Sequence, residues 1–309
     1  MPNILIANPE YFDEQAVKIL KSAGDVTART MSRSELERSI HKFDAIVLRV
    51  DTKLDRKLLS RAKRLKVIGS ATTGLGHIDT EYAAKHGIKI IGLHGAHTTS
   101  TAEHTMALML SLARKVPWAF ESMKQGRWKR AMFIGAQLEG RTLGIIGVGR
   151  IGSRVAEHAR GFGMKVMGYD PYASPKGVRM VNLERLLKDS DIVTLHPVLT
   201  GETRHMISLR QLRMMKRTAL LVNTSRGEVV NSRDLIHALK SGIIAGAALD
   251  VFPEEPLTGI GNMFAREARR LDTLIITPHL GASTREAIHR AGAEIAAKVG
   301  KALAEGHGQ

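Results

Sequence analysis

A glycine-rich turn between a predicted strand and a predicted helix constrains this chain more than any other feature. Residues 143–146 form an apolar run typical of a buried strand, and Gly147-Val148-Gly149-Arg150-Ile151-Gly152 follows it, opening a helix expected over 150–159. The first glycine permits a tight turn, the second lets the backbone approach a pyrophosphate, and the third lets helix and strand pack closely. Because free N–H groups at a helix start attract negative charge, the turn predicts a dinucleotide-binding site.

An acidic residue follows at the position that such a site requires. Asp170 ends the next predicted strand, residues 164–170, where a carboxylate accepts hydrogen bonds from the adenosine ribose. A carboxylate there repels a 2′-phosphate, which favours NAD over NADP. The alternative is an aspartate that only caps the turn before Pro171. The complete strand, turn, helix and strand context favours the ribose contact.

Strand-like and helix-like segments alternate along the whole chain, which predicts parallel βαβ units and an α/β fold. Before the glycine turn we expect strands at 4–7, 45–48, 65–68 and 88–91, and helices at 13–23, 34–41, 54–62 and 79–85. After it we expect strands at 191–195, 219–223, 245–249 and 274–277, and helices at 209–216 and 233–240. The length of 309 residues fits two domains, and the first ninety or so residues form one α/β unit of their own.

Two segments match a capping box, in which a serine and a glutamate three residues later exchange bonds with the backbone. Ser100 and Glu103 would open a helix that reaches about Lys115, and Ser283 and Glu286 would open the last helix. Residues 106–113 are apolar nearly all round, so this helix should be buried on all sides, between two domains or against a second subunit. Pro117 should stop it, and residues 118–128 should form another helix.

Composition excludes several classes of protein. The chain has no cysteine, so disulfides, thiol nucleophiles and cysteine-bound metals are excluded. No run approaches the length needed to span a bilayer, and Met1-Pro2-Asn3 begins no signal segment, which indicates the cytoplasm. The net charge of +16 could attract anionic substrates, or nucleic acid nonspecifically. With two Trp, four Tyr and seven Phe, however, the stacking platform of a single-strand binder is missing, so nucleic acid is not the expected partner.

Four side chains suited to binding anions or moving protons follow successive predicted strands. Arg226 follows one strand, Asp250 and Glu255 follow the next, and His279 follows the last. Ligands bind at this edge of a parallel sheet, so we expect these residues together. Arg226 would pair with a 2-keto acid carboxylate, and His279 would exchange the hydroxyl proton during hydride transfer. Glu255 would raise the pKa of the imidazole, whereas Asp250 is better placed to orient the cofactor or Arg226.

Each of these residues also has a structural interpretation. Arg226 could satisfy helix-end carbonyls, Glu255 could be an exposed loop charge, and His279 could be a hydrogen-bonded edge residue; together on successive strand ends they favour catalysis. His196, which also follows a strand, is the rival proton carrier. The spacing of three other histidines, His94, His97 and His104, could suggest a metal, but no H-E-x-x-H motif or carboxylate partner accompanies them. We therefore expect no metal.

At this point the motifs carry a family resemblance over nearly the whole chain. The chain resembles the D-isomer-specific 2-hydroxyacid dehydrogenases and is most similar to their phosphoglycerate dehydrogenase branch. The motifs occur in the family's order: Leu138-Glu139-Gly140-Arg141-Thr142-Leu143-Gly144-Ile145-Ile146-Gly147, Asn223-Thr224-Ser225-Arg226-Gly227, Ala248-Leu249-Asp250-Val251-Phe252-Pro253-Glu254-Glu255-Pro256 and Thr277-Pro278-His279-Leu280-Gly281-Ala282-Ser283-Thr284.

The resemblance implies a fold of two Rossmann-like, doubly wound parallel-sheet domains. A flavodoxin-like substrate domain would comprise residues 1–95 and 283–309, and an NAD-binding Rossmann domain residues 96–282. It also implies a cytoplasmic homodimer formed through the cofactor domain, a small anionic 2-hydroxy or 2-keto acid as substrate, and a role in serine biosynthesis. The carboxy-terminal regulatory domain of many phosphoglycerate dehydrogenases is not expected.

The resemblance also implies roles for individual residues. The catalytic residues would be Arg226, Glu255 and His279, and Asp250 would contact the nicotinamide carboxamide. The cofactor-binding residues would be Gly147, Gly149, Arg150, Ile151, Gly152, Asp170, His196, Thr203, Thr224, Asp250 and Gly281. The substrate-binding residues would be Arg49, Thr73, Gly74 and Leu75, with Arg49 as the candidate for a distal phosphate.

The chain departs from the phosphoglycerate branch in two loops. In the carboxylate-binding turn, residues 71–79, Gly76-His77 replaces the usual acidic-plus-amide pair, and Thr72 stands where glycine is common. In the cofactor loop, Pro197 comes one place early after His196. A glyoxylate or hydroxypyruvate reductase is therefore the alternative enzyme. The family's fold also serves an NAD-sensing transcriptional corepressor, but the intact Arg226, Glu255 and His279 favour catalysis.

Overall fold

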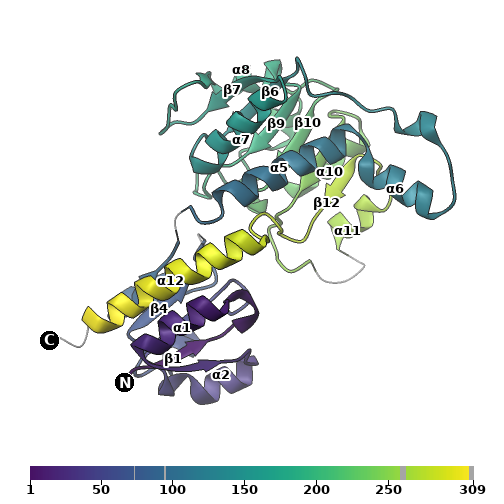
Figure 1. Ribbon diagram of the computed structural model, residues 1–309. Helices are drawn as coiled ribbons and strands as arrows, with labels where there is room; N and C mark the ends of the chain where they lie inside the picture. Colours follow the sequence, from purple (N-terminus) through teal and green to yellow (C-terminus); the bar gives the residue numbers. More distant parts are fainter. Residues whose placement is uncertain (73, 94, 258–261, 306–309) are drawn as a thin grey trace. The chain divides into compact units, whose positions relative to one another are not determined.

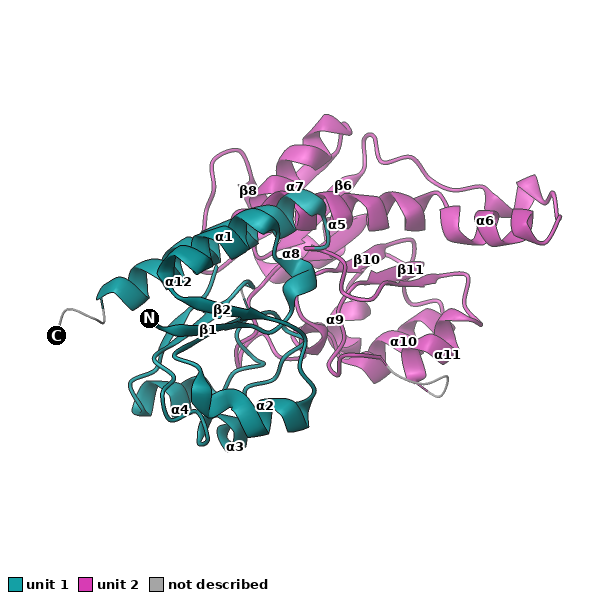
Figure 2. Ribbon diagram, turned by 60° about the horizontal axis from the view of Figure 1, so that its bottom comes forward, with its two compact units in different colours: residues 1–97, 283–309 teal, residues 98–282 magenta. Residues whose placement is uncertain are grey.

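The chain folds into two compact units. The computed structural model describes residues 1–72, 74–93, 95–257 and 262–305. Unit 1 comprises Met1–His97 and Ser283–Gln309, and unit 2 comprises Thr98–Ala282 (Figure 2). The chain thus leaves unit 1 at the start of one long helix and returns to it at the start of another.

Unit 1 is built on a five-stranded sheet in which all neighbouring strands are parallel, in the order β2-β1-β3-β4-β5. The strands are β1 (Asn3–Ile6), β2 (Asp25–Ala28), β3 (Ala45–Leu48), β4 (Val67–Ser70) and β5 (Lys89–Ile91). The helices are α1 (Glu14–Ala23), α2 (Arg33–Ser39), α3 (Arg56–Leu59), α4 (Thr80–Lys85) and α12 (Arg285–Glu305), with 3₁₀ turns η1 (Pro9–Tyr11) and η2 (Ile40–Lys42). The strand order reverses between β1 and β3, the kind of point where α/β sheets bind ligands.

The carboxy-terminal helix α12 completes unit 1. It packs against α1 and β4, and a Cβ on Gly69 of β4 would lie 2.5 Å from Cγ2 of Val299. Its buried residues, among them Ala291, Ile295 and Val299, join a core with β1, β3 and α1. Residues from the two ends of the chain therefore share one hydrophobic core.

Unit 2 is built on a seven-stranded sheet, also parallel between all neighbours, in the order β12-β11-β10-β9-β6-β7-β8 (Figure 1). The strands are β6 (Thr142–Ile146), β7 (Lys165–Tyr169), β8 (Arg179–Met180), β9 (Ile192–Leu195), β10 (Leu220–Asn223), β11 (Gly246–Leu249) and β12 (Leu274–Ile276). The helices are α5 (Thr98–Ala113), α6 (Val116–Lys124), α7 (Arg150–Gly161), α8 (Leu183–Asp189), α9 (Leu209–Leu212), α10 (Ser232–Lys240) and α11 (Met263–Ala268), with 3₁₀ turns η3 (Arg130–Phe133) and η4 (Gly227–Val229).

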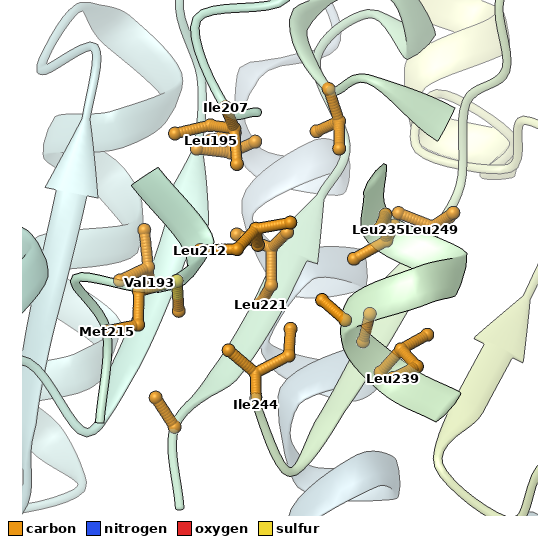
Figure 3. Packing of buried hydrophobic residues seen from close by; sticks show 14 of the residues in the cluster. Val193, Leu195, Ile207, Leu212, Met215, Leu221, Leu235, Leu239, Ile244 and Leu249 are labelled. Carbon is orange, nitrogen blue, oxygen red and sulfur yellow. The ribbon is translucent and has the colours of Figure 1, made fainter. Parts of the chain in front are cut away.

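Both faces of this sheet are buried, as expected for parallel strands. One face carries a core that includes the ten residues labelled in Figure 3: Val193, Leu195, Ile207, Leu212, Met215, Leu221, Leu235, Leu239, Ile244 and Leu249. The other face packs against α5 and α7 through a second core that includes Met109, Leu143 and Val155. Packing on both faces holds the strands in place. The candidate functional residues lie in the loops that follow these strands.

Both predicted capping boxes are wrong in register. α5 begins at Thr98, so Ser100 lies inside the first turn, where its helical backbone cannot act as a cap. α12 begins at Arg285, and Oγ1 of Thr284, rather than that of Ser283, accepts a bond from the N–H of Ala287 at 3.2 Å. The helix start therefore lies two residues from the predicted one in α5, and in α12 the neighbouring Thr284 takes the place of Ser283.

The apolar helix α5 is not buried on every side within the chain, because Glu103 and Ala107 are exposed. The carboxy-terminal end of α5 also differs from the prediction. Lys115 adopts a left-handed conformation with φ 55° after the helix has ended, and Pro117 lies in the first turn of α6 instead of stopping α5. None of the helices in the described part of the chain combines the length and apolar character needed to cross a membrane.

Candidate active site

The glycine turn lies at the switch point of the unit 2 sheet, where β7 and β9 flank β6 on opposite sides. Gly147 has φ +86°, and a Cβ there would lie 2.5 Å from the carbonyl carbon of His196, the residue that follows β9. A Cβ on Gly152 would lie 2.1 Å from the carbonyl oxygen of Gly147. Both positions therefore exclude a side chain for steric reasons.

The start of α7 is open. Gly149 is the N-cap and makes no side-chain cap bond, and a Cβ on it would meet no described atom within 4 Å. Arg150 is exposed beside it, and Ile151 is half-buried. The first turn of this helix therefore offers backbone N–H groups in open space, as binding of a diphosphate requires.

Asp170 links the second strand to the glycine turn. Its Oδ2 accepts a bond from the N–H of Val148 at 2.8 Å, and its Oδ1 accepts bonds from Tyr172 at 2.8 Å and Ala173 at 3.0 Å. The turn-capping role that the sequence left as an alternative is thus present. A carboxylate has about four acceptor positions, so one position on Oδ2 stays available for a ribose hydroxyl.

The loop after β10 is shaped by Asn223. Its Oδ1 accepts bonds from the N–H and the hydroxyl of Ser225, and its amide donates to the carbonyl of Arg226 at 2.9 Å. The Arg226 side chain is half-buried, and its Nη1 donates to the carbonyl of Ser225 at 2.6 Å. The remaining guanidinium N–H groups are donors for an anion.

A glycine lets this loop approach the loop that carries Glu255. A Cβ on Gly227 would lie 2.0 Å from the carbonyl carbon of Phe252 and 2.3 Å from the nitrogen of Pro253. Only a residue without a Cβ allows this backbone contact. The contact brings Arg226 to the same side of the sheet edge as the segment from Phe252 to Glu255.

Glu255 and His279 form a pair. Oε2 of Glu255 lies 2.6 Å from Nδ1 of His279, and its Oε1 accepts a bond from the N–H of Phe252 at 2.8 Å. Bonded at both oxygens, the carboxylate is fixed in orientation. The imidazole is partly exposed, with 41% of its side-chain surface accessible. Because Nδ1 faces Glu255, Nε2 is the nitrogen left for a substrate.

The pair determines the protonation of His279. The hydrogen bond to Glu255 raises the pKa of the imidazole, partial burial opposes this rise, and the charges of Glu255 and Asp250 add to it. The guanidinium of Arg226 is near enough to lower the same pKa. The three residues that the sequence proposed as catalytic therefore interact in one cluster.

Asp250 does not face solvent, since only 1% of its surface is exposed. Its Oδ1 accepts bonds from the hydroxyl of Thr277 at 2.6 Å and the N–H of Leu280 at 2.8 Å, and its Oδ2 from the N–H of Gly281 at 2.8 Å. Burial opposes ionisation, but these bonds and one to His104 lower the pKa of Asp250. The carboxylate thus organises the turn that carries His279.

His104 is the residue that sequence reasoning missed. Its Nε2 lies 3.1 Å from Oδ1 of Asp250 and 3.3 Å from Oγ1 of Thr277. Its spacing from His97 and from His94, which lies outside the described residues, suggests only a metal ligand. Because 146 residues separate it from Asp250, no spacing in the sequence signals the contact.

The remaining cofactor-binding candidates differ in the side-chain groups that they leave free for a ligand. Burial lowers the pKa of His196 to about 3, so it is a neutral imidazole and a poor rival to His279 as proton donor. Thr203 bonds Thr200 and Val198 and closes its own loop. Thr224 is buried, and its hydroxyl bonds that of Thr105 at 2.9 Å.

In unit 1, Arg49 lies at the switch point between β1 and β3. Its N–H donates to Oδ1 of Asn8 at 3.1 Å, and its guanidinium carbon lies 4.2 Å from the ring centroid of Tyr11. Its Nε is buried and has no hydrogen-bond partner in the described part of the chain. Burial lowers the pKa of His97, and the charge of Arg49 adds to that effect. The guanidinium is thus stacked and available to an anion.

The turn after β4 contains a buried polar network. The hydroxyl of Ser70 bonds that of Thr72 at 2.8 Å and lies 3.2 Å from Nε2 of His77. The Thr72 hydroxyl also donates to the carbonyl of Gly74 at 2.9 Å. Burial lowers the pKa of His77 to about 4, so a neutral imidazole supports this turn. The half-buried Leu75 follows in the turn, whereas Thr73 lies outside the described residues.

No cluster of three or more metal-binding side chains occurs among the residues that the structure describes.

Comparisons with known proteins identify the family of the chain. Residues 106–281 match the family model "D-isomer specific 2-hydroxyacid dehydrogenase, NAD binding domain". The chain is 43% identical to the D-3-phosphoglycerate dehydrogenase of Methanocaldococcus jannaschii over 98% of this chain and 58% of that protein. It is 40% identical to the hydroxypyruvate reductase of Thermotoga maritima, over 94% of this chain and 95% of that protein.

A solved structure is also similar over the whole chain. The D-lactate dehydrogenase of Aquifex aeolicus, complexed with NAD and lactic acid, superposes with a TM-score of 0.84 at 33% identity and covers 98% of this chain and 96% of that one. The fold and the glycine turn are those of a dinucleotide-binding α/β protein. The chain belongs to the D-isomer-specific 2-hydroxyacid dehydrogenase family. It spans little more than half the length of the phosphoglycerate dehydrogenases that it matches.

We expect Glu255→Gln to lower the pKa of His279. The amide removes the charge and the strongest interaction that raises this pKa, so the imidazolium is lost at a lower pH. NMR titration of the histidine ring measures the change in the free protein. Glu254→Gln, at the exposed neighbouring carboxylate, is the matched control and should not change the titration midpoint of His279. An unchanged midpoint in Glu255→Gln would contradict the assigned pair.

Proposed function

We propose that the chain is an NAD-dependent D-2-hydroxyacid dehydrogenase, in which Arg226, Glu255 and His279 carry the chemistry. The observation that supports this most is the contact of 2.6 Å between His279 and Glu255, with the Arg226 guanidinium close enough to influence the same imidazole. A carboxylate-oriented imidazole beside a guanidinium can supply a proton to a carbonyl oxygen while the carboxylate of the same substrate is held. The three residues follow adjacent strands of the nucleotide-binding sheet.

The residues around the glycine turn fit the cofactor. Gly147, Gly149 and Gly152 leave room for a pyrophosphate at the open start of α7, with Arg150 and Ile151 in its first turn. The free position on Asp170 would accept a ribose hydroxyl, and His196, Thr203, Thr224, Asp250 and Gly281 would line the remainder of the site. When bound, the nicotinamide supplies the hydride.

The protein's own part in the reaction is binding and proton transfer. Arg226 would hold the substrate carboxylate through guanidinium N–H groups not used by Ser225. During reduction the imidazolium of His279 would donate the Nε2 proton to the carbonyl oxygen, and Glu255 would stabilise the imidazolium through Nδ1. In the oxidative direction the neutral imidazole would accept that proton. Because Glu255 raises the pKa of His279, reduction should weaken as the pH rises through that pKa.

For the substrate we propose phosphoglycerate or a related anionic hydroxy acid, which would place the chain in serine biosynthesis. The stacked guanidinium of Arg49 supports a distal phosphate. Thr73, Gly74 and Leu75 would bind the carboxylate end. In this proposal unit 1 is the substrate domain and unit 2 the NAD-binding domain.

A hydroxypyruvate or glyoxylate reductase is the second candidate. It is supported by the similarity to the hydroxypyruvate reductase of Thermotoga maritima, to which the chain is 40% identical. The Gly76-His77 pair in the substrate turn also departs from the phosphoglycerate branch. Steady-state rates on a panel of 2-keto acids separate the two candidates.

We further propose a cytoplasmic homodimer formed through unit 2. The segment from α6 through η3 extends from the body of this unit (Figure 1) and exposes large apolar side chains. They are Val116, Phe120, Met123, Trp128, Met132 and Ile134. Exposed apolar side chains gathered in one segment are typical of a protein–protein interface, and a second copy of the chain is the proposed partner.

His279→Ala should lower the turnover of 2-keto acids by about a hundredfold or more, because it removes the proton donor. NADH affinity, measured by fluorescence titration, should stay within about threefold, since His279 acts on the substrate. Wild-type turnover that is undetectable with every 2-keto acid, together with salt-sensitive DNA binding, would instead support a regulator.

Arg49→Ala should reduce kcat/KM for the phosphorylated acid by about tenfold or more and for glyoxylate much less, because only the former has a distal phosphate. Arg56→Ala, at an exposed arginine of α3, is the control and should leave both substrates unaffected. Equal losses with both substrates for Arg49→Ala would mean that no phosphate binds there.

Light scattering at micromolar concentration should give the mass of two chains. Trp128→Glu should shift the mass toward one chain, because it places a charge in the proposed interface, whereas Tyr172→Glu, at an aromatic residue of similar exposure outside the segment, should not. A wild-type monomer would exclude this dimer.

A further inference from the structure

The first half of α5 carries three polar side chains that bind loops at the edge of the unit 2 sheet. Oγ1 of Thr101 donates to the carbonyl of Gly281 at 3.2 Å, Nε2 of His104 lies 3.1 Å from Asp250, and the Thr105 hydroxyl bonds that of Thr224 at 2.9 Å. Residues three and four apart share one face of a helix. This face therefore contacts the loops after β10, β11 and β12 together.

His104 occupies the central position of that face. Its side chain is 18% exposed, and the carboxylate that it meets is 1% exposed. The Asp250 oxygen nearest to it also accepts bonds from Thr277 and from the N–H of Leu280. Because hydrogen bonds to a buried charge are strong and costly to lose, the Nε2–H of His104 contributes to the orientation of this carboxylate.

The turn that Asp250 holds is the one that carries His279. The N–H of His279 donates to the backbone carbonyl of Asp250 at 2.9 Å, and the next two N–H groups donate to the Asp250 side chain. His279 has φ +55°, a left-handed conformation that side-chain-bearing residues rarely adopt. Such a conformation persists only where neighbouring groups impose it, and Asp250 accepts bonds from three successive N–H groups of this turn.

We propose that His104 is a positioning residue that acts through Asp250 to hold the turn carrying His279 in its reactive conformation. The expected effect on kcat rests on the proposed dehydrogenase function. The expected change in the environment of His279 can be measured by NMR even if the protein turns over no substrate. His104 lies against Asp250 and Thr277, and it serves as a donor at one ring nitrogen, so glutamine can substitute for it where leucine cannot.

The experiment compares His104→Leu, which removes the donor at similar volume, with His104→Gln, which keeps an N–H group near Nε2. Glu103→Gln, at the exposed neighbouring position of α5, is the control. For each protein, kcat and KM are measured against pH with the best 2-keto acid, the His279 titration is followed by NMR, and the thermal midpoint is recorded.

We expect His104→Leu to lower kcat about tenfold with KM for the keto acid within about twofold, because His104 does not touch the substrate. The groups that face His279 are Glu255, Asp250 and Arg226. When Asp250 is held less firmly, its negative charge raises the pKa of His279 by a smaller amount. The titration midpoint of His279 should therefore drop by roughly half a pH unit. The loss of rate at high pH should begin correspondingly lower. His104→Gln should restore most of kcat and the midpoint.

The outcomes separate this inference from the proposed function. If the wild type turns over keto acids and His104→Leu matches it in kcat and in its pH profile, the positioning role is wrong while the function stands. If no keto acid is turned over, the function is wrong, and the NMR midpoint alone decides the role of His104. Equal losses in His104→Leu and His104→Gln, with equally lowered thermal midpoints, would show a merely structural role and overturn the proposal.

Discussion

The structure depends on one geometric constraint, the parallel direction of every neighbouring pair of strands in both sheets. Parallel strands all end at the same edge, so short loops from distant parts of the chain meet there. In unit 2 this edge brings together the glycine turn after β6, Arg226 after β10 and His279 after β12. Packing on both faces of the sheet holds these ends, and glycines at 147 and 227 permit the backbone contacts between loops.

Two carboxylates with different surroundings have different roles at this edge. Glu255 is partly exposed and bonds the imidazole of His279 directly, which raises the pKa of that ring. Asp250 is buried and saturated with donors, which lower its own pKa. One carboxylate adjusts a proton donor, whereas the other holds the turn that presents it. The left-handed backbone of His279 shows that this turn needs such support.

Much of the fold could be predicted because most strands are apolar runs and most helices have recognisable ends. The strands that were missed are β2 and β8, at the edges of their sheets. β2 reads Asp-Val-Thr-Ala and is largely exposed, so it lacks the apolar pattern on which the prediction relied. The second capping box failed because the adjacent Thr284 suits a helix start as well as Ser283 does. The helices α8 and α11 were also missed, although Asn182 and Asn262 cap their starts in the structure.

The sequence by itself determined the class of fold, the nucleotide-binding turn and the identity of the residues after each strand, because glycine sterics and apolar periodicity are local properties. It also identified Arg226, Glu255 and His279 as candidates. Only the tertiary structure decided which nitrogen of His279 is engaged by Glu255, that His196 is a neutral imidazole, and that His104 contacts Asp250. Those facts arise from distances between segments far apart in the chain, and burial and charge act on a side chain only through the neighbours that folding provides.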